Sequence, residues 1–423
     1  MFALEKKQKA MISSRNMGEL YNNIEMPLTE ILFDMQKCGF KVDVNILKQM
    51  GKELQQQIDV LQAEIYKSAG SEFNINSPKQ LGVILFEDLG LDVIKKTKTG
   101  YSTDSYVLEK LHNSHEIIPQ IVEYRQLTKL KSTYIDGIIP IIDRTTGKLH
   151  TNLHQTGAVT GRLSSSDPNL QNIPIKNEVG REIRKAFLPS SDDYTLVSAD
   201  YSQIELRVLA HIAKEQNMIQ AVKNKVDIHT NTAAQVYDVP VEEVTRSMRS
   251  SAKAVNFGIV YGISDFGLAR QLDIPTSKAA EFIKKYFEAF PGIKDYMDNT
   301  IKFGRDTGFV ETLYHRRIYL PDLKATNYTR RQAAERIAMN APIQGSAADI
   351  IKLAMIAVFN ELSKGKLRSK MILQVHDELI IDTYKEEKDK IKAILKKEME
   401  NVFKLDCPLI VDISEGGNWY EAK

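Results

Sequence analysis

The sequence predicts an α+β fold in which an antiparallel sheet is interrupted by a helical insertion and preceded by a helical arm. Two strand-like runs carry acidic residues: 195–197 precedes Asp200, and 371–373 precedes Asp377. The second run continues through His-Asp-Glu into the apolar residues 379–381, as expected for a hairpin. Helical patterns separate the two runs, so we expect both runs to join one sheet across an insertion.

Length, charge, cysteine content and the absence of long apolar stretches argue against a disulfide-rich secreted protein and a membrane protein. The chain has 423 residues, 43% of them hydrophobic, which suits more than one lobe around a sizeable core. The formal charge of +2 means that any basic surface must be local. The two cysteines offer neither a disulfide framework nor zinc spacing, and no signal peptide or span-length apolar stretch is visible. We therefore expect a soluble, cytoplasmic protein without a membrane partner.

The N-terminal part reads as a helical arm. Residues 19–134 are mostly helical in pattern, and one helix start is legible where Ser77 can cap and Pro78 can occupy the first turn. The basic, hydroxyl-rich segment 95–103 fits either an ordinary solvated loop or a tip that grips phosphates.

Short strands are expected from Gly147 onward, followed by a loop at 160–174 that is rich in Gly, Ser, Asn and Pro. This loop also holds donors suited to groove or backbone contacts, although such residues are common turn formers: Arg162, Asn169, Gln171 and Asn172. Helical patterns dominate 211–328, and a helix at 330–356 leads back to the hairpin and to a final helix and strand.

Residues 245–262 form the third informative segment. Arg249, Lys253, Phe257 and Tyr261 recur every four residues, which predicts one stripe on a helix. Two cations followed by two aromatic rings match a nucleoside triphosphate laid along the helix. Gly258 and Gly262 would let a base or sugar approach closely. The alternative is a surface helix with incidental spacing.

Asp200 and Asp377 have the chemistry of a two-metal phosphoryl-transfer site. Hard cations such as Mg²⁺ prefer oxygen ligands, and a pair of ions clamps the attacking and leaving oxygens. The alternative is that buried strands simply end in solvated aspartates.

These segments resemble, in the same order, motifs A, B and C of the family A DNA polymerases: SADYSQIELR at 198–207, the 245–262 helix and QVHDELIID at 374–382. The loop at 160–174 matches the corresponding family segment at nearly every residue, and the resemblance extends from about Leu20 to the end of the sequence. It implies a right-hand polymerase fold with an antiparallel-sheet palm, helical fingers and a helical thumb. The implied domains are 1–145 (N-terminal segment and thumb), 146–210 (first part of the palm), 211–328 (fingers) and 329–423 (second part of the palm).

The resemblance implies a DNA-directed DNA polymerase that adds dNTPs to a primer 3′-hydroxyl with two Mg²⁺ ions, for which Mn²⁺ can substitute. Asp200 and Asp377 would be the metal ligands, assisted by the Tyr201 carbonyl, with Glu378 accessory. Arg249 and His229 would bind the outer phosphates, and Lys253 would act as general acid.

Sugar and template selection follow from the same resemblance. Glu205 would be the steric gate against a ribose 2′-hydroxyl, with help from Phe257, although a Glu at this position also suits a surface salt bridge. Phe rather than Tyr at 257 implies discrimination against dideoxynucleotides. Tyr261 would stack at the templating position.

The implied primer–template contacts come from the loop, the returning helix and the hairpin: Arg162, Arg336, Asn340, Gln344 and His376. Three of these, at 336, 340 and 344, share one helix face. Minor-groove acceptors are nearly alike for all base pairs, so donors there can sense correct pairing without reading sequence.

The chain departs from the family pattern at two positions: Ser250 follows Arg249 where a second arginine is common, and His315 stands where glycine is usual. Residues 1–150 lack an Asp-x-Glu pair, so we expect neither 3′–5′ proofreading nor 5′ nuclease activity. We expect a monomer, in a bacterial or phage-infected cytoplasm or an organellar matrix. The alternatives are an RNA-templated or RNA-synthesising relative, and a catalytically silent DNA-binding replication protein.

Overall fold

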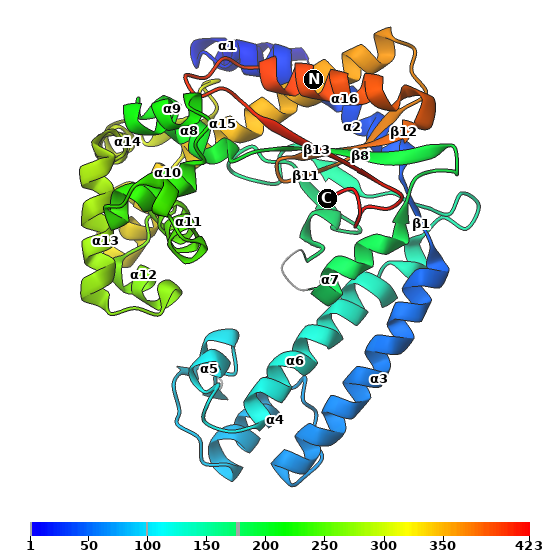
Figure 1. Ribbon diagram of the computed structural model, residues 1–423, viewed down its shortest axis with the longest axis vertical. Coiled ribbons are helices and arrows are strands. Elements are labelled where there is room, and N and C mark those ends of the chain that lie inside the picture. Colours follow the sequence, from blue (N-terminus) through cyan, green and yellow to red (C-terminus); the bar gives the residue numbers. More distant parts are fainter. Residues whose placement is uncertain (1, 99, 175–177) are drawn as a thin grey trace.

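The computed structural model describes residues 2–98, 100–174 and 178–423. A sheet lies at the centre, and a helical arm and a helical insertion both extend from the same side of it (Figure 1). The C-terminus lies beside the sheet on that side (Figure 1).

The central sheet is antiparallel and has the strand order β11-β12-β8-β13. Its strands are β8 (Tyr194–Tyr201), β11 (Lys370–Val375), β12 (Glu378–Tyr384) and β13 (Val411–Gly416). The expectation that both acidic runs share one sheet is confirmed. In its register, Asp200 stands opposite Glu378 on one side and Asp412 on the other.

The sheet separates two hydrophobic cores because side chains alternate along a strand. Val197, Ala199 and Tyr201 point into the core formed with the insertion and the long helix α15 (Tyr328–Lys364). Leu196 points into the core shared with the arm. Asp200 lies on the Leu196 side, so the acidic residue of β8 faces the same side of the sheet as the core shared with the arm.

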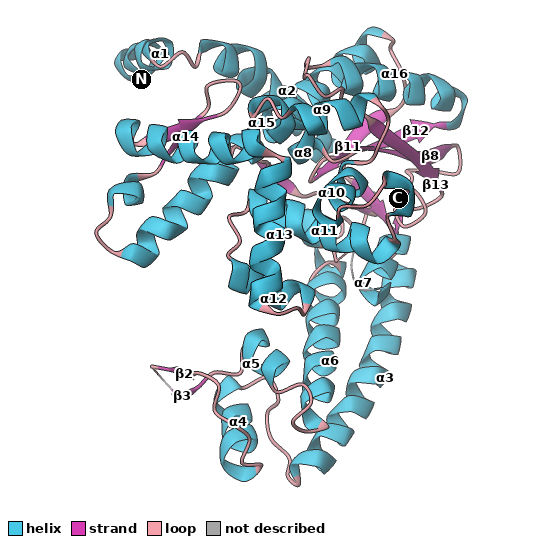
Figure 2. Cartoon of the chain, turned by 60° about the vertical axis from the view of Figure 1, so that its left-hand side comes forward, coloured by secondary structure: helices cyan, strands magenta, loops and turns pink. Residues whose placement is uncertain are grey.

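Two long helices, α3 (Val44–Ala69) and α6 (Ile117–Leu130), run side by side along the arm (Figures 1 and 2). Asp43 caps the start of α3, where its carboxylate accepts from the Asn45 and Ile46 amides, and Gly70 caps the end in the left-handed region (φ 73°). The predicted start of α4 (Pro78–Val83) is confirmed, since the Ser77 hydroxyl accepts from the Gln80 amide.

The tip of the arm contains β2 (Lys96–Thr97), β3 (Gly100–Tyr101) and α5 (Ser105–Lys110). Thr99, within the predicted basic segment, lies outside the described residues. The other elements before β8 are α1 (Phe2–Ser14), η1 (Leu20–Glu25), α2 (Met26–Cys38), β1 (Phe40–Val42), η2 (Ile84–Asp88), η3 (Lys131–Asp136), η4 (Ile139–Ile141), β4 (Lys148–Leu149), β5 (Asn152–His154), β6 (Ser164–Ser166), η5 (Leu170–Asn172), α7 (Glu178–Glu182), η6 (Ile183–Ala186) and β7 (Phe187–Leu188).

The insertion is helical, as predicted, except for one small hairpin. Its elements are α8 (Ile204–Ile212), α9 (Gln216–Lys223), α10 (Ile228–Tyr237), η7 (Val241–Glu243), α11 (Arg246–Val260), α12 (Asp265–Leu272), α13 (Thr276–Ala289), α14 (Pro291–Thr307), β9 (Phe309–Glu311), β10 (Arg317–Tyr319) and η8 (Pro321–Lys324). After β12 come η9 (Lys385–Glu387) and α16 (Lys388–Asn401).

Helix α15 is longer than the predicted 330–356 at both ends and continues through Pro342. In the described part of the chain it is the helix long and apolar enough to cross a membrane, but 72% of its apolar window is buried inside the protein. That burial is what a central core helix requires.

Candidate active site

The structure brings Asp200 and Asp377 together at one end of the two central strands, β8 and β12. Asp377 sits in the two-residue turn between β11 and β12, where His376 takes a positive φ of 54°. Non-glycine residues adopt this conformation at some energetic cost, which the paired strands on either side hold in place. The Tyr201 amide donates to the Asp377 carbonyl (3.1 Å), so the two acidic segments adjoin through their backbones.

Both carboxyls carry raised pKa values. Burial raises the pKa of Asp200 to about 6, with Lys423 acting to lower it and Glu378 and Asp412 to raise it further. Burial also raises the pKa of Asp377 to about 7. The nearby cations, Lys423 for both groups and Arg162 for Asp377, do not bring these pKa values back to the ordinary value of an aspartate. The site would therefore be stabilised by additional positive charge.

The donor set suits Mg²⁺ bound together with a phosphate substrate. Among the residues that the structure describes, no group of three or more His, Cys, Asp or Glu side chains could hold a metal ion. Mg²⁺ is commonly held by one or two carboxylates, with waters and substrate phosphates completing its octahedron. Asp200, Asp377 and the nearby Tyr201 carbonyl fit that pattern.

Glu378 is already occupied within the protein. Its carboxylate is fully buried and accepts from the Ser198 hydroxyl (2.6 Å) and from Lys423 Nζ (2.5 Å). Lys423 and Asp412 complete the charge pattern of the site, and the sequence offered no signal for either. Both lie near the end of the chain in positions that only the strand register and the tail fold bring to Asp200.

Helix α11 carries the predicted cationic face. It begins at Thr245, which caps the Met248 amide, and buries Ala252, Val255 and Ile259. Arg249 and Lys253 on the other face are exposed.

The stripe ends earlier than predicted. Phe257 is half-buried on α11, but the helix ends at Val260, and Tyr261 is the 44% exposed residue that follows. Gly262 then takes a positive φ of 66°, which breaks the helical path.

The structure gives the two glycines a packing role inside the protein, and their role in admitting a base or sugar stays a prediction. A Cβ on Gly258 would meet Ile263 Cγ2 at 2.8 Å. A Cβ on Gly262 would meet the Arg336 and Met339 side chains, each at 2.7 Å. The absent side chains therefore make room for internal packing between the end of α11 and its neighbours.

Arg249 is bound by a carboxylate of its own protein. Asp227 accepts from Arg249 Nε (2.9 Å) and Nη2 (3.1 Å) and also caps α10 through the Thr230 amide (2.9 Å). Despite partial burial, these contacts hold the pKa of Asp227 well below its ordinary value. A triphosphate binding to Arg249 must share or replace Asp227.

His229 is buried between α10 and α11. The Asn256 side-chain amide donates to His229 Nδ1 (3.1 Å) and also bonds Thr232 Oγ1 (3.0 Å). Burial lowers the pKa of His229 to about 4, so the ring is neutral near pH 7. With Nδ1 accepting, the ring proton resides on Nε2.

Glu205, in the first turn of α8, is buried rather than exposed. It forms an ion pair with Arg162 and accepts from the Tyr261 hydroxyl (3.3 Å). The sequence left open a salt bridge of Glu205 at the surface. The structure contains a salt bridge, but its Glu205 carboxylate is buried. It joins the 160–174 loop, α8 and the end of α11.

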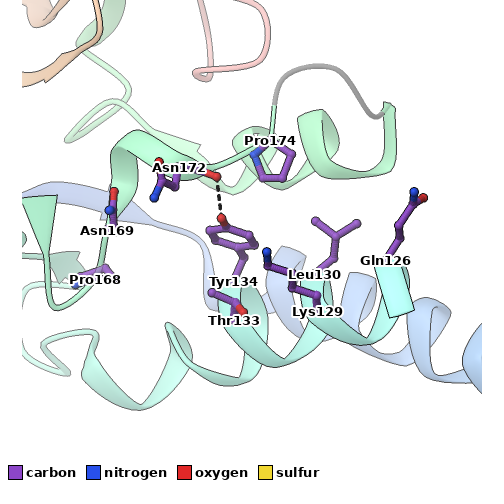
Figure 3. A pocket seen from close by; sticks show the side chains of 9 residues that line it. All are labelled: Gln126, Lys129, Leu130, Thr133, Tyr134, Pro168, Asn169, Asn172 and Pro174. Carbon is purple, nitrogen blue, oxygen red and sulfur yellow. Dashed lines mark hydrogen bonds between the residues drawn. The ribbon is translucent and has the colours of Figure 1, made fainter. Parts of the chain in front are cut away.

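The 160–174 loop packs against the base of the arm. Gln171 Nε2 donates to the Gln374 carbonyl (3.2 Å), while Asn169 caps η5 through the Gln171 amide (3.0 Å). The Tyr134 hydroxyl donates to the Asn172 carbonyl (2.5 Å), as Figure 3 shows. Tyr134, Asn169 and Asn172 border a cavity of about 600 Å³ whose lining combines loop and arm: Gln126, Lys129, Leu130, Thr133, Tyr134, Pro168, Asn169, Asn172 and Pro174 (Figure 3).

The other predicted duplex contacts remain accessible. Arg336 and His376 are exposed, and Asn340 and Gln344 are half-buried along α15. Asn340 Oδ1 has no hydrogen-bond partner among the described residues.

The two departures from the family pattern lie in different settings. Ser250 is exposed on α11. His315 takes a positive φ of 60°, which explains why glycine suits that position. The adjacent Arg316 joins a largely buried network with Glu25, Asp349 and Lys352.

An acidic antiparallel sheet from which a helical arm and a helical insertion extend on one side defines the right-hand polymerase fold, with palm, thumb and fingers. The profile of DNA polymerase family A matches residues 44–421. The chain belongs to DNA polymerase family A.

Known relatives agree with this assignment. DNA polymerase I of Caldicellulosiruptor bescii is 58% identical over 404 residues, covering 96% of this chain and 47% of that protein. DNA polymerase I of Geobacillus stearothermophilus is 52% identical over 423 residues, covering 100% of this chain and 48% of that protein. The chain thus spans about half the length of the curated relatives that it matches.

A solved structure shares the fold. The POL domain of Pol1 from M. smegmatis, in complex with DNA primer-template and dNTP, has a TM-score of 0.92 at 40% identity. The match covers 97% of this chain and 72% of that chain.

Proposed function

We propose that the chain catalyses DNA-directed DNA synthesis, adding dNTPs to a primer 3′-hydroxyl. The observation that carries the proposal is that Asp200 and Asp377 lie on adjoining segments, joined by the hydrogen bond from the Tyr201 amide to the Asp377 carbonyl. The same chain exposes the cationic face of α11 and the polar donors of α15. The family membership and the relatives' names support the same activity.

Asp200, Asp377 and the Tyr201 carbonyl would hold two Mg²⁺ ions, or Mn²⁺ in their place. When bound, the ions supply charge stabilisation to the attacking and leaving oxygens. The chain's own contribution would be to hold both carboxylates at the ends of two paired central strands, which would fix where a primer terminus and an α-phosphate can meet.

The exposed face of α11 would bind the triphosphate. Arg249 would exchange Asp227 for the outer phosphates, since its planar guanidinium suits both partners. Lys253, one turn away, would give a proton to the leaving pyrophosphate. His229 Nε2–H would donate to a phosphate as a neutral group, because its pKa is far below 7.

Glu205, Phe257 and Tyr261 would enclose the sugar and the templating position. The Glu205–Tyr261 hydrogen bond of 3.3 Å places a carboxylate against the end of α11, where a ribose 2′-hydroxyl would lose space. Phe257 lacks the hydroxyl that would favour dideoxynucleotides, and exposed Tyr261 is available for stacking.

The duplex would lie between the arm and α15. Four side chains would face the minor groove near the primer end: Arg336, Asn340, Gln344 and His376. Arg162 would make the same kind of contact once its ion pair with Glu205 is broken. Asn169 and Asn172 line the base of the arm, and Gln171 lies against Gln374 of β11; all three would contact the DNA backbone.

The division into thumb (1–145), palm (146–210 and 329–423) and fingers (211–328) belongs to this proposal. So do the absence of proofreading and 5′ nuclease activity from this chain, its monomeric state and its action in the cytoplasm. An RNA template or ribonucleotide synthesis is the main alternative, and the buried position of Glu205 favours deoxynucleotides.

Primer extension on a DNA template with Mg²⁺, offering dNTPs and rNTPs in parallel, tests the proposal. We expect extension with dNTPs only. Extension with rNTPs would overturn the role of Glu205, and bound duplex without any extension would favour a silent DNA-binding protein.

A further inference from the structure

The last residues of the chain fold back onto the acidic face of the palm. Trp419 is fully buried, its ring lying 5.4 Å from Phe187 and 5.8 Å from Phe40 between centroids. Its amide donates to the Phe187 carbonyl (3.0 Å), and a Cβ on Gly416 would meet the Ala422 nitrogen at 2.5 Å. The segment is therefore anchored and tightly turned, so its final side chain has a defined place.

That side chain is Lys423, whose ammonium reaches Glu378. Lys423 Nζ lies 2.5 Å from Glu378 Oε2, and the Glu378 side chain is 1% exposed. The second oxygen of Glu378 accepts from the Ser198 hydroxyl (2.6 Å). A buried carboxylate requires a counter-charge and hydrogen bonds, and here Lys423 provides the charge.

Glu378 stands in a row of acidic residues. The strand register pairs Glu378 with Asp200, and Asp200 with Asp412, so their side chains leave the same face of the sheet. Like charges at paired positions repel. After burial, the strongest influence on the pKa of Asp200 is Lys423, which lowers it, and Lys423 also lowers the pKa of Asp377.

We propose that Lys423 is a positioning residue of the active site, which holds Glu378 away from the metal ions and limits the negative charge that Asp200 and Asp377 present to them. This inference rests on the proposed function, because it assumes that those two carboxylates bind divalent cations. Nothing else in the described chain reaches Glu378 with a positive charge at ion-pair distance.

Removing the ammonium has a definite electrostatic consequence. Glu378 then loses its ion-pair partner, and Oε2 is free to become a further oxygen ligand. Both effects favour a divalent cation, so binding of Mn²⁺ in the absence of DNA tightens by about fivefold or more at pH 8.5.

The experiment titrates the whole chain with Mn²⁺ alone and follows the free ion by electron paramagnetic resonance. Asp377→Asn identifies the binding that belongs to this site. Lys423→Met is compared with Lys423→Arg, which retains the charge, and with the double variant Lys423→Met/Glu378→Gln, which restores the balance while keeping a partner for Ser198.

Lys388→Met is the matched control. It removes the same unit charge from an ion pair with Glu415 (3.2 Å), which keeps its second pair with Lys392 (2.6 Å). The strand position of Glu415 faces the opposite side of the sheet. Thermal unfolding of every variant verifies folding. We expect tighter Mn²⁺ binding in Lys423→Met, and values near the parent's in Lys423→Arg, Lys388→Met and the double variant.

Unchanged or weaker Mn²⁺ binding in folded Lys423→Met would overturn the proposal, as would tightening that persists in the double variant. Primer extension by the parent protein, measured in parallel, distinguishes failure of the proposed role of Lys423 from failure of the proposed function. If the parent extends primers and Lys423→Met binds like it, only the role of Lys423 fails. If the parent neither binds Mn²⁺ nor extends primers, the proposed function fails with it.

Discussion

At the scale of single residues, the acidic and basic groups of the site differ in how well they are neutralised within the protein. Asp200 and Asp377 are short of positive charge, whereas Arg249 and Arg162 are each paired to a carboxylate of the protein. Under the proposed function, phosphates and cations would bind by exchanging partners, which avoids leaving a buried charge unpaired.

Glu205→Ala tests the gate. Removing the side chain opens space beside Tyr261, so we expect discrimination between dNTPs and rNTPs to fall by about tenfold or more. Single-nucleotide incorporation rates measure the ratio. Glu205→Gln, which keeps the volume, should retain most of the discrimination, and loss of discrimination in that variant would argue against a steric origin.

The buried His229 makes stability depend on pH. Its folded pKa of about 4 lies below the ordinary 6.5, so the unfolded chain binds the extra proton between these values. The stabilising contribution is complete above pH 6.5 and is lost as pH falls towards 4.

At pH 5 the loss relative to pH 7.5 should be about 2 kcal/mol of unfolding free energy. Urea unfolding of the parent and of His229→Gln at both pH values isolates this contribution. An identical pH dependence in the two proteins would mean that His229 is not buried as described.

At the scale of elements, much of the site follows from sequence patterns and part of it does not. The β11–β12 hairpin and the cationic face of α11 follow from periods of two and four residues. The ion pairs Arg249–Asp227 and Arg162–Glu205 do not, because they join helices or loops that only the tertiary fold brings together. The glycines of 258 and 262 show the same limit: their conformational freedom is visible in sequence, but the side chains that need the space are not.

Gly262→Ala tests the packing between α11 and α15. The substitution combines positive-φ strain with contacts of 2.7 Å to Arg336 and Met339, so we expect a loss of about 1–3 kcal/mol in stability. Gly308→Ala is the control, because it has a positive φ of 85° but nothing within 4 Å. Equal thermal destabilisation of the two variants would assign the whole cost to backbone strain.

At the scale of the whole molecule, a nearly neutral formal charge is combined with one exposed cationic face, that of α11. The order of arm, sheet, insertion and sheet was predictable because the motifs sit in sequence order. The contacts between residues far apart in the sequence were not predictable. Glu25 forms ion pairs with Lys352 and Arg316, and Trp419 packs on Phe40.

Binding to primer–template DNA should depend steeply on salt, because the proposed contacts are largely to phosphates. We expect the affinity to fall by about tenfold or more between roughly 50 and 200 mM salt. Fluorescence anisotropy with a labelled duplex measures the slope, and a flat response would contradict the proposed binding surface.

The most direct test of the central claim is primer extension by Asp377→Asn, with duplex binding measured in the same preparation. The account predicts that extension falls by about a hundredfold or more while the dissociation constant of the duplex stays within about threefold of the parent's. Asp406→Asn, at an exposed ion pair with Lys214 (2.9 Å), should extend like the parent. Near-parental extension by Asp377→Asn would contradict the assignment of Asp200 and Asp377 as the catalytic pair.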